Sequence, residues 1–213
     1  MTDFVHLHVH SEYSLLDGMS TPHEMAQAAS TNGQTSIAIT DHGSMAGVLK
    51  FQDACKKQSV KPIFGIEAYF TPRLEDDKLD EKTERYHLIL LAKNDDGLKK
   101  LFRLNKEAWS DGFYYKPRMD FGMLEKVVGN DIIALSGCRG SAIAKAIEND
   151  DTGRAERLTK KFIDIFGDDF YFEIQSWNPG KINEGLINLA SAYEKVVVPT
   201  LDCHYPFKSD AGI

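Results

Sequence analysis

Short apolar segments with strand character alternate along the chain with segments of helical periodicity. Seven segments are predicted to be strands: Phe4–His10, Ser36–Thr40, Pro62–Phe70, His87–Ala92, Ile132–Leu135, Phe170–Gln175 and Val196–Thr200. Alternation of this kind predicts a parallel sheet covered by helices, either an open doubly wound sheet or a closed barrel. No glycine-rich phosphate loop follows the first strand, which disfavours the dinucleotide-binding form of the open sheet.

The clearest helix start is Thr21-Pro22-His23-Glu24, with Thr21 as N-cap, Pro22 at the first helical position and Glu24 closing a capping box. This helix is expected to end at Asn32-Gly33. Further helices are predicted over Met45–Gln58, Asp95–Trp109, Ser141–Asn149, Arg154–Phe166 and Ile182–Tyr193. The charged segment Glu75–Arg85 is predicted to be an exposed loop or a frayed helix, and Asp111–Asp120 an aromatic and basic loop.

Length and composition are those of an ordinary globular domain. The 213 residues suffice for one domain with a hydrophobic core, predicted to span residues 1–213, and 42% of them are hydrophobic. No apolar run approaches the roughly 18 residues of a membrane span, so no membrane partner is expected. Met1–His10 does not have the pattern of a signal peptide, so the expected location is cytoplasmic.

The charge balance and the cysteines narrow the function classes. The formal net charge is −7, which disfavours tight DNA binding by this chain alone unless bound cations offset it. Three cysteines without paired spacing argue against a disulfide framework. The cysteines are therefore expected to be thiols, and one of them is a candidate metal ligand.

Residues that ligate metals recur near the ends of the predicted strands. In the first strand, His6, His8 and His10 alternate and therefore share one face. The complete candidate set contains nine residues: His8, His10, Asp17, His42, Glu67, His87, Cys138, Asp202 and His204. A parallel barrel gathers the ends of its strands around one mouth, so residues that are distant in the sequence would meet there.

These donor groups predict both the cofactor and the reaction. Imidazole, carboxylate and thiolate groups form a ligand set for zinc, manganese or iron. Nine ligands are too many for one ion, so we expect two or three divalent ions, with a carboxylate such as Glu67 bridging a pair. Two metals a few ångströms apart are a recurrent device for hydrolysing phosphate esters. The pattern therefore predicts a metal-dependent phosphoesterase in which Asp17 and Glu67 act together with a metal-activated water.

Residues outside this set have weaker signals. His6 is expected to support a ligand rather than to bind a metal, and Cys55 to lie in the core. Cys203 lies between two candidate ligands, so its side chain should point the other way and pack outside the barrel. Arg118 and Arg139 are candidates for binding the substrate phosphate, with a surface ion pair as an equal alternative for each.

Six segments of the sequence also carry a resemblance to a known family. In chain order they are Phe4–Gly18 (FVHLHVHSEYSLLDG), Ala38–Gly43 (AITDHG), Lys61–Glu67 (KPIFGIE), Tyr115–Arg118 (YKPR), Leu135–Cys138 (LSGC) and Phe166–Glu173 (FGDDFYFE). They resemble the polymerase and histidinol phosphatase (PHP) domain, and more narrowly the form found in the alpha subunit of bacterial DNA polymerase III. The resemblance covers essentially the whole chain.

The resemblance implies a distorted seven-stranded β/α barrel that holds three metal ions. It implies one ion held by His8, His10, Glu67 and Asp202, a second by Glu67, His87 and Cys138, and a third by Asp17, His42 and His204. Because all nine positions carry a ligating residue, it also implies an active copy, which in such polymerases is a 3′–5′ exonuclease that proofreads a DNA 3′ end. The expected partners are that DNA end and the remaining domains of a longer polymerase alpha subunit, whose polymerising domains are not in this chain.

Three other functions use the same site. One is a small-molecule phosphatase of the histidinol-phosphatase type, and another is a pyrophosphatase. The third is a non-catalytic module of the polymerase in which the metals are structural. An open groove would favour a DNA end, a lidded pocket would favour a small ester, and metals without turnover would favour the structural module.

Overall fold

The computed structural model describes residues 4–74, 85–207 and 210. The helices and strands, in chain order, are α1 (Pro22–Thr31), β1 (Ser36–Ile39), α2 (Val48–Lys57), β2 (Lys61–Phe70), β3 (Tyr86–Ala92), α3 (Asp95–Ser110), β4 (Phe113–Tyr114), β5 (Lys116–Met119), α4 (Phe121–Val127), β6 (Ile132–Leu135), α5 (Ala142–Glu148), α6 (Thr152–Phe166), β7 (Phe170–Gln175), α7 (Gly180–Ala192) and β8 (Val197–Thr200). No helix within these ranges is long and apolar enough to cross a membrane.

The sheet curls into a barrel that the N-terminal segment closes. From β1 the pairing runs through β2, β3, β6 and β7 to β8. Residues 6–10 fill the remaining gap, because the amide of Ala38 donates to the carbonyl of His6 at 2.9 Å on one side. On the other side, the amide of His10 donates to the carbonyl of Cys203 at 2.8 Å. Together with residues 6–10, the six labelled strands around the ring confirm the distorted seven-stranded barrel.

The strands are not all parallel, which corrects the expectation of a parallel sheet. β3 runs antiparallel to both of its neighbours, β2 and β6, whereas β1–β2, β6–β7 and β7–β8 are parallel pairs. The expectation rested on the alternation of strand-like and helical segments and of side chains within strands, and side chains alternate in the same way in parallel and antiparallel strands. The prediction for Glu75–Arg85 falls on residues 75–84, which lie outside the described residues.

Two smaller differences from the sequence predictions concern one predicted strand and one predicted loop. The predicted strand Phe4–His10 forms only isolated bridges, from His6 to Ile37 and from Val9 to Cys203. The predicted loop Asp111–Asp120 contains the β4–β5 hairpin, and β5 pairs with the end of β2. The two strands of the hairpin are only two and four residues long, so they lack the alternating pattern by which a strand is recognised in sequence.

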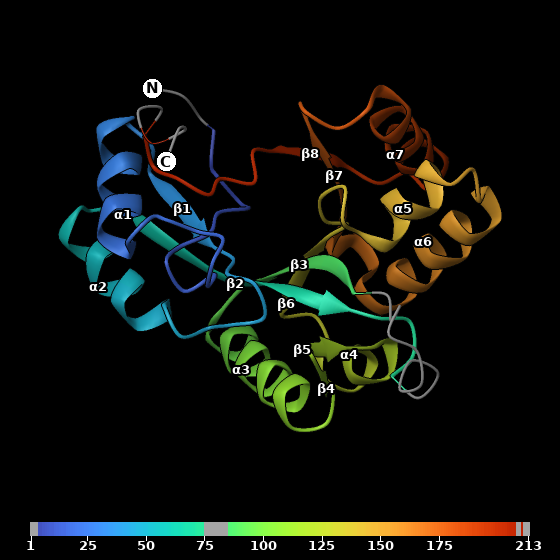
Figure 1. Ribbon diagram of the computed structural model, residues 1–213, viewed down its shortest axis with the longest axis horizontal. Coiled ribbons are helices and arrows are strands. Elements are labelled where there is room, and N and C mark those ends of the chain that lie inside the picture. The colour runs from blue at the N-terminus through green and yellow to red at the C-terminus, as the bar shows by residue number, and fades with distance from the viewer. Residues whose placement is uncertain (1–3, 75–84, 208–209, 211–213) are drawn as a thin grey trace.

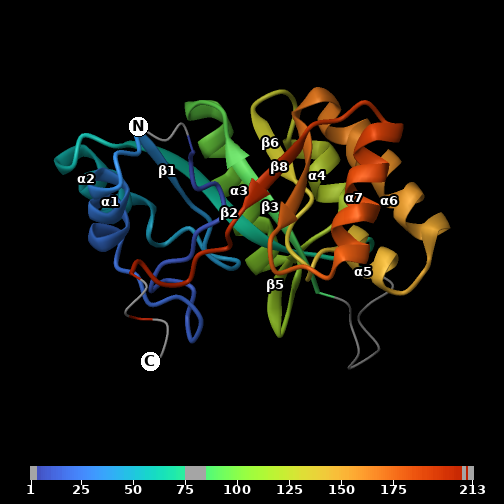
Figure 2. The ribbon, with the colours of Figure 1, turned by 90° about the horizontal axis from the view of Figure 1, so that it is seen from above.

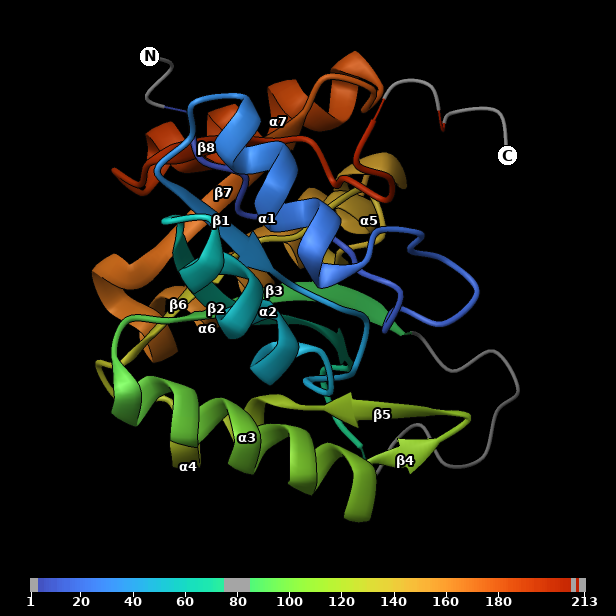
Figure 3. The same cartoon turned by 90° about the vertical axis from the view of Figure 1, so that its left-hand side faces the viewer.

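Helices cover the outside of the barrel on three sides. α1 and α2 lie on one side, α5, α6 and α7 on the opposite side, and α3 with α4 beneath (Figures 1 and 2). α3 runs alongside the β4–β5 hairpin (Figure 3). The expected capping box of α1 is present, since the Thr21 hydroxyl accepts from the amide of Glu24 and the Glu24 carboxylate accepts from the amide of Thr21.

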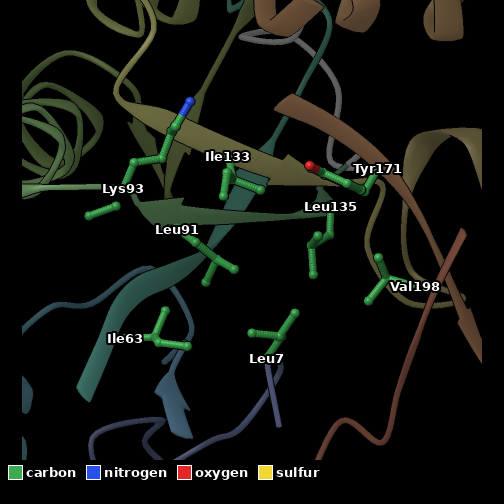
Figure 4. Close-up of a pocket in the computed structure, with 9 residues that line it drawn as sticks. Leu7, Ile63, Leu91, Lys93, Ile133, Leu135, Tyr171 and Val198 are labelled. Atoms are coloured by element: carbon green, nitrogen blue, oxygen red, sulfur yellow. The ribbon is translucent and has the colours of Figure 1, made fainter. Parts of the chain in front are cut away.

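The inside of the barrel divides into an apolar end and a polar end. At the apolar end, a pocket of about 330 Å³ is lined mainly by aliphatic side chains, including Leu7, Ile63, Leu91 and Val198 (Figure 4). Ile63 precedes Glu67 by four residues in β2, and Leu91 follows His87 by four residues in the antiparallel strand β3. The candidate ligands Glu67 and His87 therefore lie toward the opposite end of the barrel.

Candidate metal centre

The nine candidate ligands come from every part of the chain and meet at the polar end of the barrel. His8 and His10 project from the closing segment and are completely buried. Glu67 lies in β2, His87 near the start of β3, and Cys138 just after β6. The other four lie in loops that follow the closing segment, β1 and β8: Asp17, His42, Asp202 and His204. Because β3 runs antiparallel to β2 and β6, a ligand at the start of β3 lies at the same mouth of the barrel as ligands toward the ends of β2 and β6.

Glu67 is at the centre of the cluster. Its side chain is 1% exposed and lies among four imidazoles. Its Oε2 atom is 3.3 Å from His8 Nε2, 3.1 Å from His10 Nε2 and 2.9 Å from His42 Nδ1. Its Oε1 atom is 3.0 Å from His87 Nδ1. The two carboxylate oxygens therefore face different histidines, which is the arrangement that a bridging carboxylate requires.

The ligand atoms fall into three overlapping groups. Within each group, all the ligand atoms lie within 4.8 Å of one another: His8, His10, Glu67 and Asp202; His42, Glu67 and His87; His10, Asp17, His42 and His204. Each pair of groups shares one residue, namely His10, His42 or Glu67. The groups form one continuous array, and they correspond closely to the three ligand sets that the family resemblance implies.

The third group is the most accessible part of the array. Asp17 Oδ2 is 3.2 Å from His42 Nε2 and 2.9 Å from His204 Nε2. The side chains of Asp17 and His204 are 39% and 30% exposed, whereas Glu67 and His8 have almost no exposed surface. Asp17 and His204 therefore form the outer side of the centre, and Glu67 forms its floor.

Cys138 completes the second group. Its Sγ atom lies 3.3 Å from His87 Nδ1 and 3.7 Å from Glu67 Oε1, and the side chain is buried. Burial raises the pKa of the Cys138 thiol, and the nearby charges of Glu67 and Asp202 raise it further. A cation beside the sulfur reverses this balance, because coordination favours the thiolate. Cys138 is therefore unsuited to act as a free nucleophile and well suited to bind a metal.

A second layer of buried polar residues holds the histidines in place. Glu173 Oε1 is 2.7 Å from His8 Nδ1, and the Ser14 hydroxyl is 2.8 Å from His10 Nδ1. Ser14 Oγ in turn donates to Asp41, which also accepts from the amide of Ser11. Carboxylates and hydroxyls at the far nitrogen of a ligating histidine fix its tautomer and ring orientation. No sequence motif assigned this role to Glu173, although a lone acidic residue in the apolar strand β7 is a detectable signal.

The electrostatics of the cluster follow from burial and close charge pairing. Burial disfavours the charged form of His8, but Glu67 and Glu173 outweigh it and hold the pKa of His8 well above its usual value. Burial likewise opposes the charging of His10, yet the adjacent carboxylates of Asp202 and Glu67 raise its pKa to about 9. The same histidines lower the pKa of Glu67 far below its usual value in spite of its burial. In the metal-free protein, protons on His8 and His10 thus supply the positive charge that the buried carboxylates require.

The residues present fit divalent cations. Three ligand atoms are buried and have no partner with hydrogen-bond geometry, although each lies close to other atoms that can ligate a metal: His42 Nδ1, Glu67 Oε2 and Asp202 Oδ1. Buried polar atoms without partners are costly. Nitrogen and oxygen atoms that converge without hydrogen-bonding to one another have the arrangement of ligands around a common metal ion. Imidazole, carboxylate and thiolate donors suit zinc, manganese or iron.

The two arginines proposed as phosphate contacts are engaged with other partners. Arg118 is 1% exposed, its Nε donates to the carbonyl of Gly112 at 3.2 Å, and its guanidinium lies over the Tyr114 ring. It therefore stabilises the β4–β5 hairpin, and its burial excludes direct contact with a substrate. Arg139 Nε donates to Glu148 at 2.9 Å, which is the ion-pair alternative.

Two other side chains are placed outside the cluster. His6 Nδ1 is 3.5 Å from Cys203 Sγ, so His6 contacts the cysteine rather than supporting a candidate ligand. Cys203 packs outside the barrel, as expected, beside Met25 and Ala29 of α1. Cys55 lies in the core, as expected.

Comparisons with known proteins agree with this architecture. Residues 6–177 match the PHP domain family. The chain is 42% identical over 213 residues to the DNA polymerase III subunit alpha of Aquifex aeolicus, covering 95% of this chain and 18% of that protein. It is 38% identical to the corresponding subunit of Treponema pallidum, covering 98% of this chain and again 18% of the relative. The chain thus spans about a fifth of the length of these relatives.

Solved structures show the same fold at low sequence identity. A metal-dependent phosphoesterase from Bifidobacterium adolescentis superimposes with a TM-score of 0.59 at 16% identity, covering 94% of this chain and 87% of that one. An amidohydrolase from Chromobacterium violaceum superimposes with a TM-score of 0.60 at 15% identity, covering 95% and 88%. Fold, family match and clustered ligands all agree, and the chain therefore belongs to the PHP domain family.

Proposed function

We propose that this chain is a metal-dependent phosphodiesterase that removes nucleotides from a DNA 3′ end, and that it is one domain of a replicative DNA polymerase. The observation that carries the proposal is the convergence of eight of the nine candidate ligands into three groups that share His10, His42 and Glu67, with Sγ of the ninth, Cys138, 3.3 Å from His87 Nδ1. Clustered cation sites of this kind are the recurrent apparatus for hydrolysis of phosphate esters. The proposed occupants are two or three divalent ions of zinc, manganese or iron.

The buried ligands on the floor of the centre and the partly exposed ligands on its outer side have different roles. Bound cations would supply charge stabilisation for the phosphate and would lower the pKa of a water. Glu67 and His8 are buried, and His8 is hydrogen-bonded from behind by Glu173, so these residues form a rigid floor. Asp17 and His204 are partly exposed and face the approaching substrate. We therefore assign Asp17 and Glu67 to the catalytic centre, with Asp17 acting on the side where the phosphate arrives.

DNA is the preferred substrate class on two grounds. The relatives at 36–42% identity are alpha subunits of DNA polymerase III, and such a subunit handles DNA ends. The pocket beside the third group is open to solvent and lined by exposed aromatic side chains, whereas a small phosphate ester would be better served by a closed polar pocket. The histidinol-phosphatase type, the pyrophosphatase and the structural module are the competing outcomes of the test.

The experiment incubates the metal-reconstituted protein with 5′-labelled single-stranded DNA and with a chromogenic phosphomonoester in parallel. We expect a ladder of products shortened from the 3′ end in the presence of manganese or zinc. Cleavage of the phosphomonoester alone would move the chain to the small-molecule branch. Turnover of pyrophosphate alone would identify a pyrophosphatase, and bound metal without turnover would favour a structural role.

Asp17→Asn provides the matching variant. Because Asp17 is a partly exposed loop residue, its substitution should stop DNA shortening with little change in melting temperature. The control is Asp164→Asn, which removes an exposed carboxylate on α6 and should leave the ladder unchanged. If Asp17→Asn shortens DNA at the wild-type rate, Asp17 does not belong to the catalytic centre.

A further inference from the structure

A pocket of about 560 Å³ adjoins the third ligand group. Asp17 and His42 belong both to that group and to the lining of the pocket. Much of the remaining lining is aromatic, contributed by Tyr69, Trp109, Phe113 and Tyr115. We call this the aromatic pocket. Its volume lies within the roughly 300–1,000 Å³ that is usual for ligand-binding pockets.

The rings of the aromatic pocket are exposed and held in fixed orientations. Trp109 and Phe113 stack on one another with ring centroids 5.4 Å apart and 16° between their planes, and each is about half exposed. The indole Nε1 of Trp109 donates to the carbonyl of Gly43 at 2.9 Å, which anchors the pair to the loop that follows His42. Tyr69 stacks on the imidazole of His42 with centroids 5.6 Å apart. Large rings that remain exposed beside a metal centre offer flat apolar faces to a ligand.

The rim of the pocket carries backbone strain and a positive charge. Leu16 has a φ of 65° and Tyr115 a φ of 59°, and their side chains are among the most exposed large hydrophobic groups of the described residues. Non-glycine residues avoid this left-handed region, so holding two of them there costs free energy. The ammonium group of Lys116 lies 5.2 Å from the centre of the Tyr69 ring and can meet a phosphate at the pocket edge.

These features together select a ligand that is both anionic and aromatic. We infer that the aromatic pocket binds the last unpaired bases of a DNA strand, stacking them on Trp109, Phe113 and Tyr115 while the terminal phosphodiester lies at Asp17 and His42. This inference rests on the proposed function and specifies how its substrate is held. Aromatic stacking tolerates every base, because each base has a π-face. A paired base inside a duplex has both faces covered by its neighbours, so the pocket selects frayed or single-stranded ends.

The test separates binding from cleavage. The metal-loaded chain is titrated into two 5′-fluorescein 8-mers with nuclease-resistant phosphorothioate linkages at the 3′ end, which keep the negative charge, one of oligothymidine and one of abasic sugar phosphates, and binding is followed by anisotropy. The variants are Phe113→Ala and Tyr115→Ala. The control is Phe102→Ala, which removes an exposed ring from the same helix as Trp109 but outside the pocket lining. Thermal melts confirm that each variant is folded.

We expect oligothymidine to bind more tightly than the abasic strand. Each pocket variant should weaken oligothymidine binding roughly fivefold or more and leave abasic binding unchanged. Phe102→Ala should change neither affinity. Equal affinity for the two strands, equal affinity of variants and wild type, or no binding of either strand would overturn the inference. If ring-dependent binding is observed but natural DNA is never shortened, the stacking pocket stands and the proposed exonuclease fails.

Discussion

Replacing Glu67 by glutamine tests whether the buried cluster depends on charge rather than on shape. The substitution keeps the volume of the side chain and removes its negative charge. In the metal-free protein, Glu67 and Asp202 each lie 3.1 Å from Nε2 of His10 and together raise its pKa from 6.5 to about 9. At about 1.4 kcal/mol per pH unit, this corresponds to about 3 kcal/mol of stability.

The loss expected in Glu67→Gln follows from this value. Equal distances assign about half of it, roughly 1.5 kcal/mol, to Glu67, and the pairing of Glu67 with His8 adds to this loss. Removing one partner of a buried ion pair typically costs about 3 kcal/mol or more. A raised histidine pKa stabilises the fold fully below the unfolded value of 6.5, and the effect disappears as the pH rises through about 9. We therefore expect the full loss at pH 6 and little loss near pH 10.

The assay is urea denaturation of the wild type and Glu67→Gln in the presence of a chelator, at pH 6 and pH 10. Asp168→Asn, which removes an exposed carboxylate, is the control and should show no pH-dependent difference. A loss in Glu67→Gln that is the same at both pH values would refute the electrostatic reasoning. With metals restored, Glu67→Gln should also lose more bound metal than Asp17→Asn and should abolish hydrolysis, because Glu67 faces two ligand groups.

Three further outcomes can be measured on the same protein. Glu173→Gln removes the charge behind His8 without removing a ligand, and it should weaken metal binding by about 10- to 100-fold in a competition assay with a chromophoric chelator. Metal affinity of the wild type should rise with pH between about 6 and 9, because cations must displace the protons that His8 and His10 retain, and a flat profile would contradict this. Arg118→Ala should lower the free energy of unfolding by about 3 kcal/mol, since it empties a buried site against Tyr114, and a loss below about 1 kcal/mol in urea denaturation would show that Arg118 is not structural.

The alternation of strands with helices and the candidate ligands were predictable because they depend on local patterns, whereas the closed barrel was implied by the family resemblance. His8 and His10 alternate in sequence and therefore share a face, and the same spacing recurs at Asp202 and His204. The structure brings all four to the same end of the barrel. The direction of β3 could not be predicted in this way, because alternation of side chains is identical in parallel and antiparallel strands.

The substrate contacts were harder to predict because they depend on burial. Arg118 is a cation in a basic and aromatic segment, which favoured phosphate binding in the sequence. Only the packing of the β4–β5 hairpin shows that its guanidinium points inward, toward Gly112 and Tyr114. Trp109 is equally ambiguous in the sequence, because it lies on the predicted helix α3 and a ring there normally packs in the core. Its 53% exposure beside His42 depends on the position of the whole helix.

Closure of the barrel by residues 6–10 has a consequence for synthesis of the protein on the ribosome. The two chain segments that meet at His6 and Cys203 are 197 residues apart in sequence. His8 and His10 are therefore translated early and must wait for Asp202 and His204 before their ligand groups are complete. Translation at about 5–20 residues per second makes this delay last roughly ten seconds or more. During that interval residues 6–10 lack their partner on one side, so a nascent chain paused before residue 203 should be more open to proteases and should hold metal less tightly than the finished domain.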